Sequence, residues 1–161
     1  RVVENHPTKS IKLMTSFNAI TPSDVDHLMP IETACHSHPW SEKTFNSCIG
    51  GRYFGFYLVE NNEIVGFYIG EHVVGEVTLM DICVSPNQQG KGYGKTLLNH
   101  FLQETKNLTA TKIWLEVRAK NISAQMMYIN QGFTETSRRT GYYPSANGFG
   151  YEDAIVMCLT L

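Results

Sequence analysis

The sequence has 161 residues, with 42% hydrophobic and 17% charged residues, as expected of one ordinary globular domain. Thirteen basic and fifteen acidic residues give a formal net charge of −2, and no long run of one sign is present. This balance argues against broad nucleic-acid binding and against a charged membrane-binding surface. No apolar run approaches the roughly 20 residues that cross a bilayer.

Four cysteines are scattered along the chain without a C-x-x-C pair, so neither a zinc site nor a disulfide framework is predicted. Cys83 and Cys158 lie in apolar runs and are expected to be buried thiols. Free thiols and the lack of a signal peptide favour a cytoplasmic protein. Residues 1–13 show no clear hydrophobic period, and we expect them to be an extension or a cloning remnant outside the domain.

The first predicted elements are a strand and two helices. The strand covers residues 15–20. Ser23 is expected to cap the helix that follows, and Pro30 predicts a kink or a break within that helix. A second, short helix is expected to begin after Ser41, its predicted N-cap, and to end before Gly50.

Strands are then predicted over residues 52–60 and 63–73, and Asn61 with Asn62 is expected to form a two-residue hairpin turn. An apolar strand ending at Pro86, a glycine loop and a helix follow. The remaining predicted elements are a strand over 111–119, a helix after Asn121 that ends at Gly132, and two late strands over 133–144 and 152–161. The order β-α-α-β-β-β-α-β-α-β-β predicts one α/β domain with a mixed sheet.

The glycine loop QQGKGYGKTLL follows a strand and opens a helix, which is the arrangement of an anion site. Gly94, Lys95 and Thr96 fit the end of a P-loop, but Gln89 stands where that motif needs its first glycine. The G-x-G-x-G spacing also differs from the dinucleotide pattern. A plain glycine turn without a ligand is the alternative. We therefore expect a pyrophosphate here, but not that of a nucleoside triphosphate.

Two further residues are candidates for acid–base chemistry. Glu116 lies in the apolar strand KIWLEVR, where a carboxylate is costly unless it is paired or protonated. It is a general base, the partner of Arg118, Arg138 or a lysine, or a residue at a strand end in solvent. Tyr128 lies in the helix after Asn121, where a core aromatic residue is the alternative to a catalytic acid.

Together, the apolar strand ending in V-x-P, the loop QQGKGYG, the strand with Glu116 and the segment NISAQMMYINQGF resemble the GNAT superfamily of N-acetyltransferases. The segments HPWSEKTF, RYF, WLEVRAKN, RRTGYYP and EDAIVM are similar to its RimI-type ribosomal-protein-alanine N-acetyltransferases. This resemblance covers the chain from about Met14 to the C-terminus. It implies one domain over residues 14–161, with a mostly antiparallel sheet of about seven strands and about four helices.

The resemblance also implies roles for individual residues. Acetyl-coenzyme A would be the co-substrate, with Glu116 as general base acting through a water, and Tyr128 as the acid that protonates the departing thiolate. The residues implied to bind the cofactor are Ile82, Cys83, Val84, Gln89, Gly90, Lys91, Gly92, Tyr93, Gly94, Lys95 and Asn121. Those implied to line a peptide groove are Trp40, Tyr142 and Tyr143.

The implied activity is acetylation of an N-terminal alanine, that of the eighteenth small-subunit ribosomal protein. Acetylation of a lysine or a small amine, and a non-catalytic acyl-coenzyme A sensor, are the alternatives. No nucleic-acid or membrane partner is expected. No metal is expected either, because His36 and His38 in the segment CHSHPW lack further ligands at suitable spacing.

Overall fold

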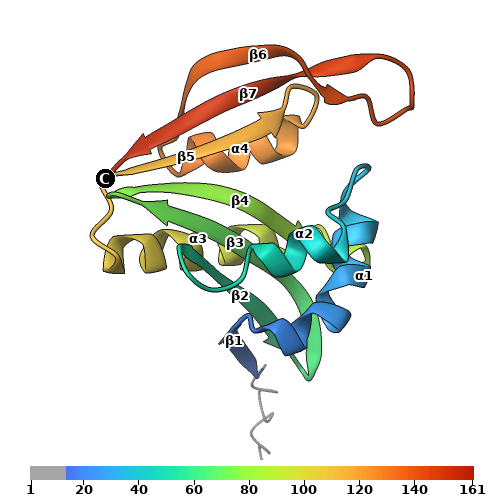
Figure 1. Ribbon diagram of the computed structural model, residues 1–161, viewed down its shortest axis with the longest axis vertical. Helices are drawn as coiled ribbons and strands as arrows, with labels where there is room; N and C mark the ends of the chain where they lie inside the picture. Colours follow the sequence, from blue (N-terminus) through green and yellow to red (C-terminus); the bar gives the residue numbers. More distant parts are fainter. Residues whose placement is uncertain (1–13) are drawn as a thin grey trace, which may run out of the picture.

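The structure, a computed structural model, describes residues 14–161. The expected extension over residues 1–13 lies outside the described residues. A seven-stranded sheet of order β1-β2-β3-β4-β5-β7-β6 is flanked by four α-helices (Figure 1). Every neighbouring pair is antiparallel except β4 with β5, so the expected fold class and element order are confirmed. The strands are β1 (Thr15–Ala19), β2 (Tyr53–Glu60), β3 (Glu63–Val73), β4 (Glu76–Val84), β5 (Lys112–Arg118), β6 (Thr134–Pro144) and β7 (Tyr151–Thr160), and the helices are α1 (Val25–Cys35), α2 (Glu42–Ser47), α3 (Tyr93–Asn107) and α4 (Ile122–Asn130).

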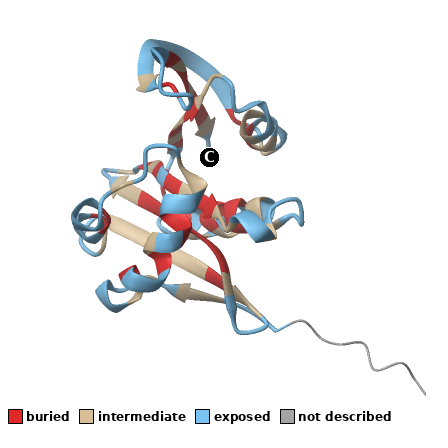
Figure 2. Cartoon of the chain, turned by 90° about the vertical axis from the view of Figure 1, so that its right-hand side faces the viewer, coloured by how far each residue is buried: buried red, intermediate tan, exposed pale blue. Residues whose placement is uncertain are grey.

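The helices form a layer on each face of the sheet, with α1 and α2 in front and α3 and α4 behind in Figure 1. Leu28 of α1 and Phe45 of α2 pack with Phe67 of β3 in the core on the front face. Phe101 of α3 packs on Tyr68 of β3 in the larger core behind. Figure 2 shows the buried residues gathered in the sheet and on the helix faces turned toward it. Burial of these apolar faces is the main force that holds the layers together.

Two local predictions are confirmed by backbone geometry. Ser41 caps α2, because its side chain accepts a hydrogen bond from the backbone N–H of Thr44 at 3.1 Å. Asn61 and Asn62 both have positive φ, at 50° and 65°, as a type I′ hairpin turn requires. These turns and caps depend on neighbouring residues only, and the sequence pattern is sufficient to find them.

The predicted cap at Ser23 is wrong. Pro22 begins a short 3₁₀ turn, Pro22–Asp24, that precedes α1, and Asp24 is the residue at the N-cap of α1. The backbone N–H of Thr21 donates to Asp24 Oδ2 at 2.7 Å. Because proline suits the first position of a helical turn, the chain starts to coil two residues earlier than the apolar pattern indicates.

Of the kink or break expected at Pro30, the break is wrong, because α1 continues past the proline to Cys35. Buried residues on either side of the proline, Leu28 and Ile31, hold the helix on the sheet. Pro30 lacks an N–H, so the carbonyl of Asp26 loses its helical partner. Both residues are exposed, and water can satisfy that carbonyl.

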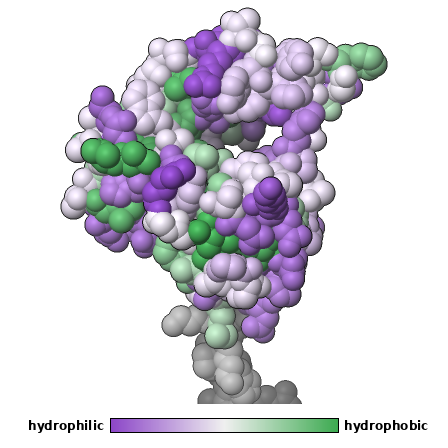
Figure 3. Space-filling view, in the orientation of Figure 1, coloured by the Kyte–Doolittle hydropathy of each residue, from purple (hydrophilic) through white to green (hydrophobic). Residues whose placement is uncertain are grey.

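The strands β4 and β5 pair only at their beginnings, where Glu76–Thr78 lies beside Lys112–Trp114. Beyond that point the two strands diverge, and the C-terminal part of the sheet separates from the rest (Figure 1). The surface is hollowed between the part built by β6 and β7 and the part below it (Figure 3). Within residues 14–161, no helix is both long and apolar enough to span a membrane.

Candidate active site

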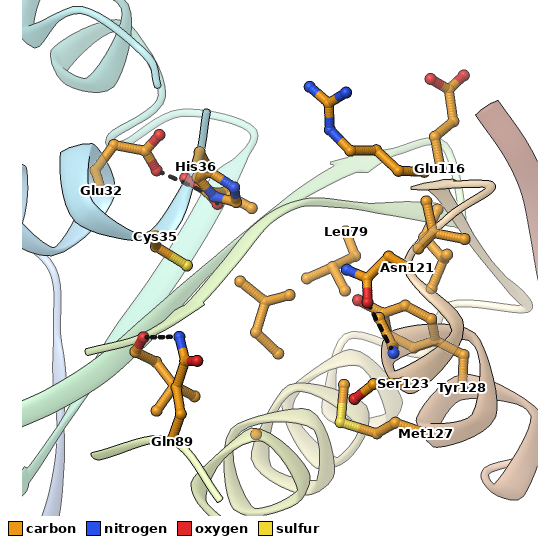
Figure 4. A pocket seen from close by; sticks show the side chains of 18 of the residues that line it. Glu32, Cys35, His36, Leu79, Gln89, Glu116, Asn121, Ser123, Met127 and Tyr128 are labelled. Carbon is orange, nitrogen blue, oxygen red and sulfur yellow. Dashed lines mark hydrogen bonds and ion pairs between the residues drawn. The ribbon is translucent and has the colours of Figure 1, made fainter. Parts of the chain in front are cut away.

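A cleft of about 740 Å³ opens where β4 and β5 diverge. It is bounded by the end of α1, the start of α3, the helix α4 and the end of β6, and Figure 4 shows it from close by. Of the residues that the resemblance implies, the cleft brings together Trp40, Ile82, Val84, Gln89, Gly90, Gly92, Tyr93, Gly94, Glu116, Asn121, Tyr128 and Tyr143. The side chains of Cys83, Lys91, Lys95 and Tyr142 do not belong to its lining.

The edge of β4 faces this cleft with backbone groups that no neighbouring strand pairs. The N–H of Ser85 donates to the carbonyl of Val65 on the β3 side at 2.8 Å. Since successive residues of a strand point their backbone groups to opposite sides, the N–H of Val84 points away from β3 into the gap. The β4–β5 pairing has already ended at Thr78, so this amide has no strand partner there. A ligand can therefore pair with this edge as another strand would.

The glycine loop lies at one end of the same edge. Gly90 and Gly92 have positive φ, at 77° and 89°, which side chains with a Cβ adopt only under strain. Helix α3 begins at Tyr93, so the first backbone N–H groups of the helix lack partners within it and carry its partial positive charge. The side-chain NH₂ of Gln89 donates to the carbonyl of Val84 at 3.3 Å and ties the loop to β4.

The two loop lysines point into solvent. Lys91 Nζ donates to Gln88 Oε1 at 3.1 Å, and Lys95 is exposed on the first turn of α3. Two positive charges therefore lie beside the loop outside the cleft, while its glycines line the cleft. An anion at this place would meet both.

The helix α4 supplies two polar groups from the opposite wall. Asn121 Oδ1 accepts a hydrogen bond from the N–H of Ala124 at 3.1 Å, which confirms the predicted cap and leaves the side-chain NH₂ to donate. Tyr128 is 5% exposed and packs on Phe133, with ring centroids 5.8 Å apart. Burial, and then the charge of Asp81, raise the pKa of Tyr128 well above its usual range. Its hydroxyl therefore keeps its proton at neutral pH.

Glu116 lies near the mouth of the cleft, with its carboxylate pointing away from Tyr128 and Asn121 in Figure 4. Its Oε1 is 3.2 Å from Nε of Arg139 on β6, so the carboxylate is ion-paired. The arginines expected as partners, Arg118 and Arg138, pair with other carboxylates. Strand order gives the reason: β7 lies between β5 and β6, and the registers place Ser137 level with Glu116. Arg139 lies two residues further along β6, and its side chain reaches diagonally to the carboxylate.

Aromatic residues form the rim of the cleft. Tyr143 lies under the guanidinium of Arg118, with Arg118 Cζ 4.6 Å from the ring centroid, and Tyr142 packs edge-on against Tyr143. On the other side, the backbone N–H of Trp40 donates to Glu32 Oε2 at 3.0 Å. The predicted peptide-groove residues thus lie on both sides of one opening, although Tyr142 itself stays outside the lining.

A cluster of polar side chains at the α1 end of the cleft was missed by the sequence analysis, apart from His36. It consists of Glu32, Cys35 and His36 from α1 and its C-cap, with Asp81 and Cys83 from β4. Burial, then Asp81, raises the pKa of Glu32 to about 8. Burial lowers the pKa of His36, but its hydrogen bond to Asp81 prevails and raises it to about 9. The sequence contains only two short patterns for this cluster, E-x-x-x-H on a helix and D-x-C on a strand. Neither pattern alone predicts a site.

The predicted burial of Cys83 and Cys158 is confirmed. The structure contains four free cysteines, and both Cys83 and Cys158 are buried. Burial raises the pKa of the Cys83 thiol above the ordinary range, whereas a hydrogen bond from Cys83 lowers the pKa of Cys35 to about 7.

Comparison with known proteins agrees with this geometry. Residues 25–133 match the model of the Acetyltransferase (GNAT) family, and the chain belongs to that family. It is 39% identical over 148 residues to the [ribosomal protein bS18]-alanine N-acetyltransferase of Escherichia coli K12, covering 92% of this chain and 99% of the relative. The protein of the same name from Haemophilus influenzae is 40% identical over 148 residues, 92% of this chain and 100% of the relative. Within the family, these relatives place the chain with the RimI-type ribosomal-protein-alanine N-acetyltransferases.

Solved structures show the same fold. The crystal structure of the ribosomal-protein-S18-alanine N-acetyltransferase from Escherichia coli has a TM-score of 0.87, with 91% of this chain and 94% of that chain covered and 39% identity. Arabidopsis thaliana NAA60 in complex with acetyl-CoA has a TM-score of 0.82 at 19% identity, covering 92% of this chain and 99% of that chain, and supports the fold alone. The expected family and architecture are thereby confirmed.

Proposed function

We propose that this chain transfers the acetyl group of acetyl-coenzyme A to the α-amino group of an N-terminal alanine, with ribosomal protein bS18 as its substrate. The names and near-complete coverage of the bacterial relatives support this substrate. The observation that carries the proposal is the unpaired edge of β4, which runs between the glycine loop and the walls bearing Glu116 and Tyr128. Enzyme and substrate then meet in the cytoplasm, where ribosomal proteins are made.

The cleft fits acetyl-coenzyme A, which supplies an acetyl group activated as a thioester. The open space around Gly90 and Gly92 lets the backbone approach a pyrophosphate, which the first N–H groups of α3 bind. The side-chain NH₂ of Asn121 and the edge of β4 hold the pantetheine arm. The N–H of Val84 donates to the thioester carbonyl oxygen, where negative charge develops during transfer.

Two side chains then move protons. Glu116 takes the proton of the attacking ammonium group through a bridging water, because only the neutral amine has a lone pair. Tyr128 donates its hydroxyl proton to the departing thiolate, and burial favours the protonated form that this step needs. The acetyl group passes directly to the amine, without an acyl-enzyme.

The acid–base chemistry favours an α-amine. A peptide N-terminus has a pKa of about 7.8 and a lysine side chain one of about 10.4. At a pH of about 7.4, roughly a quarter of the former but only ~0.1% of the latter is neutral. One carboxylate and one water are therefore sufficient for an N-terminal substrate. Trp40, Tyr142 and Tyr143 line the groove through which the peptide enters.

The test is acetylation of synthetic peptides, read by mass spectrometry. We expect acetyl-coenzyme A to modify the α-amine of a peptide with the bS18 N-terminus, and not the same peptide with its N-terminus blocked. Modification of a lysine in the blocked peptide would assign the side-chain activity instead. Tight coenzyme A binding without transfer to any peptide or polyamine would indicate a sensor.

A further inference from the structure

The end of α1 and the strand β4 bring four metal-ligating atoms together beside the cleft. They are Glu32 Oε1, His36 Nε2, Asp81 Oδ1 and Cys83 Sγ, all within 4.8 Å of one another. Figure 4 shows Glu32 and His36 pointing toward each other on the wall opposite Asn121 and Tyr128. The E-x-x-x-H spacing puts the first two on one helix face, and the D-x-C spacing puts the others on one face of a strand.

Five of the six separations between these atoms are close to those of a small tetrahedron, and the sixth, between Glu32 and Asp81, is at most 4.8 Å. His36 Nε2 lies 2.7 Å from Asp81 Oδ1, 3.0 Å from Cys83 Sγ and 3.6 Å from Glu32 Oε1. Cys83 Sγ lies 3.4 Å from Asp81 Oδ1 and 3.6 Å from Glu32 Oε1. Zinc bonds of about 2.0–2.3 Å place the ligands of a regular tetrahedron roughly 3.3–3.6 Å apart. Of these five separations, only the two shortest, both to His36, must lengthen, by about half an ångström.

The buried cluster contains a carboxylate oxygen without a partner in the described part of the chain. Glu32 is 1% exposed and Asp81 7%, so two carboxylates are held in the interior beside one imidazole. Asp81 Oδ2 is buried and has no hydrogen-bond partner among the described residues. Buried carboxylates are normally paired, hydrogen-bonded or bound to a metal, because the loss of hydration is costly otherwise. A metal ion bound by the Asp81 carboxylate would compensate for its lost hydration more fully than the hydrogen bonds to Oδ1 alone.

We propose that Glu32, His36, Asp81 and Cys83 bind one zinc ion, which fastens the end of α1 to β4. Zinc fits a mixed set of one thiolate, one imidazole and two carboxylates in tetrahedral geometry, whereas magnesium and calcium prefer oxygen ligands alone. Binding replaces the protons on the Cys83 thiol, on His36 Nε2 and on the Glu32 carboxyl by bonds to zinc, and these protons are released to solvent. Neither the acetyl transfer nor its substrate is needed for this inference.

The site would stand next to the reacting groups without taking part in the transfer. Asp81 is adjacent in sequence to Ile82, which lines the cofactor side of β4, and Glu32 also accepts from the backbone N–H of Trp40. Zinc would thus fix both the strand that faces the thioester and the loop at the peptide rim.

Calorimetry with zinc ions tests the site on the full chain, after reduction and removal of metals with a chelator. One zinc per chain is expected. Asp81→Asn and His36→Gln should each weaken binding at least ~10-fold, since each removes a ligand. The matched control is His38→Gln, which changes an exposed histidine two residues away and should leave the affinity unchanged. Absence of stoichiometric binding, or equal affinity in all three variants, would overturn the proposal.

Cobalt ions provide a spectroscopic probe of the sulfur ligand, because a cobalt–thiolate bond gives an intense charge-transfer band. The band should disappear in Cys83→Ser and persist in Cys48→Ser, which changes a buried thiol elsewhere in the front core. Circular dichroism of the metal-free variants establishes that each is folded. A band that persists in Cys83→Ser and vanishes in Cys35→Ser would contradict the ligand set, because the Cys35 thiol lies in the same cluster.

Discussion

Glu116 on β5 and Arg139 on β6 form an ion pair across β7, with 3.2 Å between Oε1 and Nε. The two side chains are 28% and 53% exposed, so the pair lies at the wet mouth of the cleft and not in a dry interior. Exposed pairs of this kind contribute only about 0–1 kcal/mol. Arg139 therefore orients the carboxylate without preventing it from accepting a proton through water.

Replacement of Glu116 by Gln is expected to lower kcat about 100-fold or more, the usual effect of losing a general base. Because the amide keeps the shape of the side chain, acetyl-coenzyme A should bind as before in calorimetry. Glu135→Gln, an exposed change on β6, is the matched control. A Glu116→Gln enzyme with the parent rate and pH–rate profile would show that another group is the base.

Replacement of Arg139 by Met tests the ion pair itself. Loss of an interaction worth at most about 1 kcal/mol changes kcat/KM by no more than roughly 5-fold. Steady-state kinetics of Arg138→Met, the neighbouring arginine on the same strand, should match the parent. If Arg139→Met lowered the activity as much as Glu116→Gln does, Arg139 would have to contact the reacting atoms.

Replacement of Tyr128 by Phe keeps the ring that packs on Phe133 and removes the acidic hydroxyl. We expect kcat to fall roughly 100-fold, within the range for general acids, with unchanged binding of coenzyme A. Rapid kinetics and calorimetry separate the two effects. If the variant binds coenzyme A poorly or unfolds at a much lower temperature, the tyrosine is structural.

The glycine loop can be tested with a matched pair of glycines. Gly92 and Gly75 have similar positive φ values, 89° and 77°, and open space where a Cβ would stand. Alanine at either position costs roughly 1–2 kcal/mol of stability through backbone strain. Only Gly92→Ala should also raise the KM for acetyl-coenzyme A, by about 10-fold, because it shifts the first amides of α3. Equal KM values for acetyl-coenzyme A in the two variants would show that the loop does not bind the cofactor.

The stability of the rear core should depend on pH through His100. Its ring stacks on Phe17, with centroids 3.7 Å apart, and its Nδ1 lies 2.7 Å from the hydroxyl of Tyr68. Burial raises the pKa of Tyr68, so the hydroxyl donates and the imidazole accepts. Burial also lowers the pKa of His100 below its ordinary value.

The unfolded chain therefore binds this proton more readily than the folded chain does. The contribution of the neutral imidazole is complete above a pH of about 6.5 and is lost as the pH falls through the lowered pKa of the folded state. Urea denaturation at several pH values should show that the free energy of unfolding decreases below a pH of about 6.5. His100→Gln should reduce the loss, whereas His27→Gln, on the exposed face of α1, should not. The same pH dependence in both variants would contradict the assignment.

The features that could be predicted from sequence are those that depend on neighbouring residues. The Asn61–Asn62 turn and the Asn121 cap follow from backbone preferences within a few positions. The partner of Glu116 could not be predicted in this way. Irregular pairing between β6 and β7, with register shifts after Glu135 and Arg139, decides which arginine reaches the carboxylate.

The same reason explains why the cluster at α1 was missed. Glu32 and His36 are separated from Asp81 and Cys83 by 45 to 51 residues in sequence. Only the packing of α1 on β4 brings them together. By contrast, the family motifs were found from sequence because the glycine loop and the segment around Glu116 are each contiguous.

A crystal structure with bound coenzyme A would show where the cofactor lies. We expect the pyrophosphate on the amides of Gly90–Gly94, the pantetheine arm along the open edge of β4, and the sulfur within about 3–4 Å of the Tyr128 hydroxyl. Coenzyme A bound elsewhere, with the gap between β4 and β5 closed or filled by side chains, would contradict the proposed function.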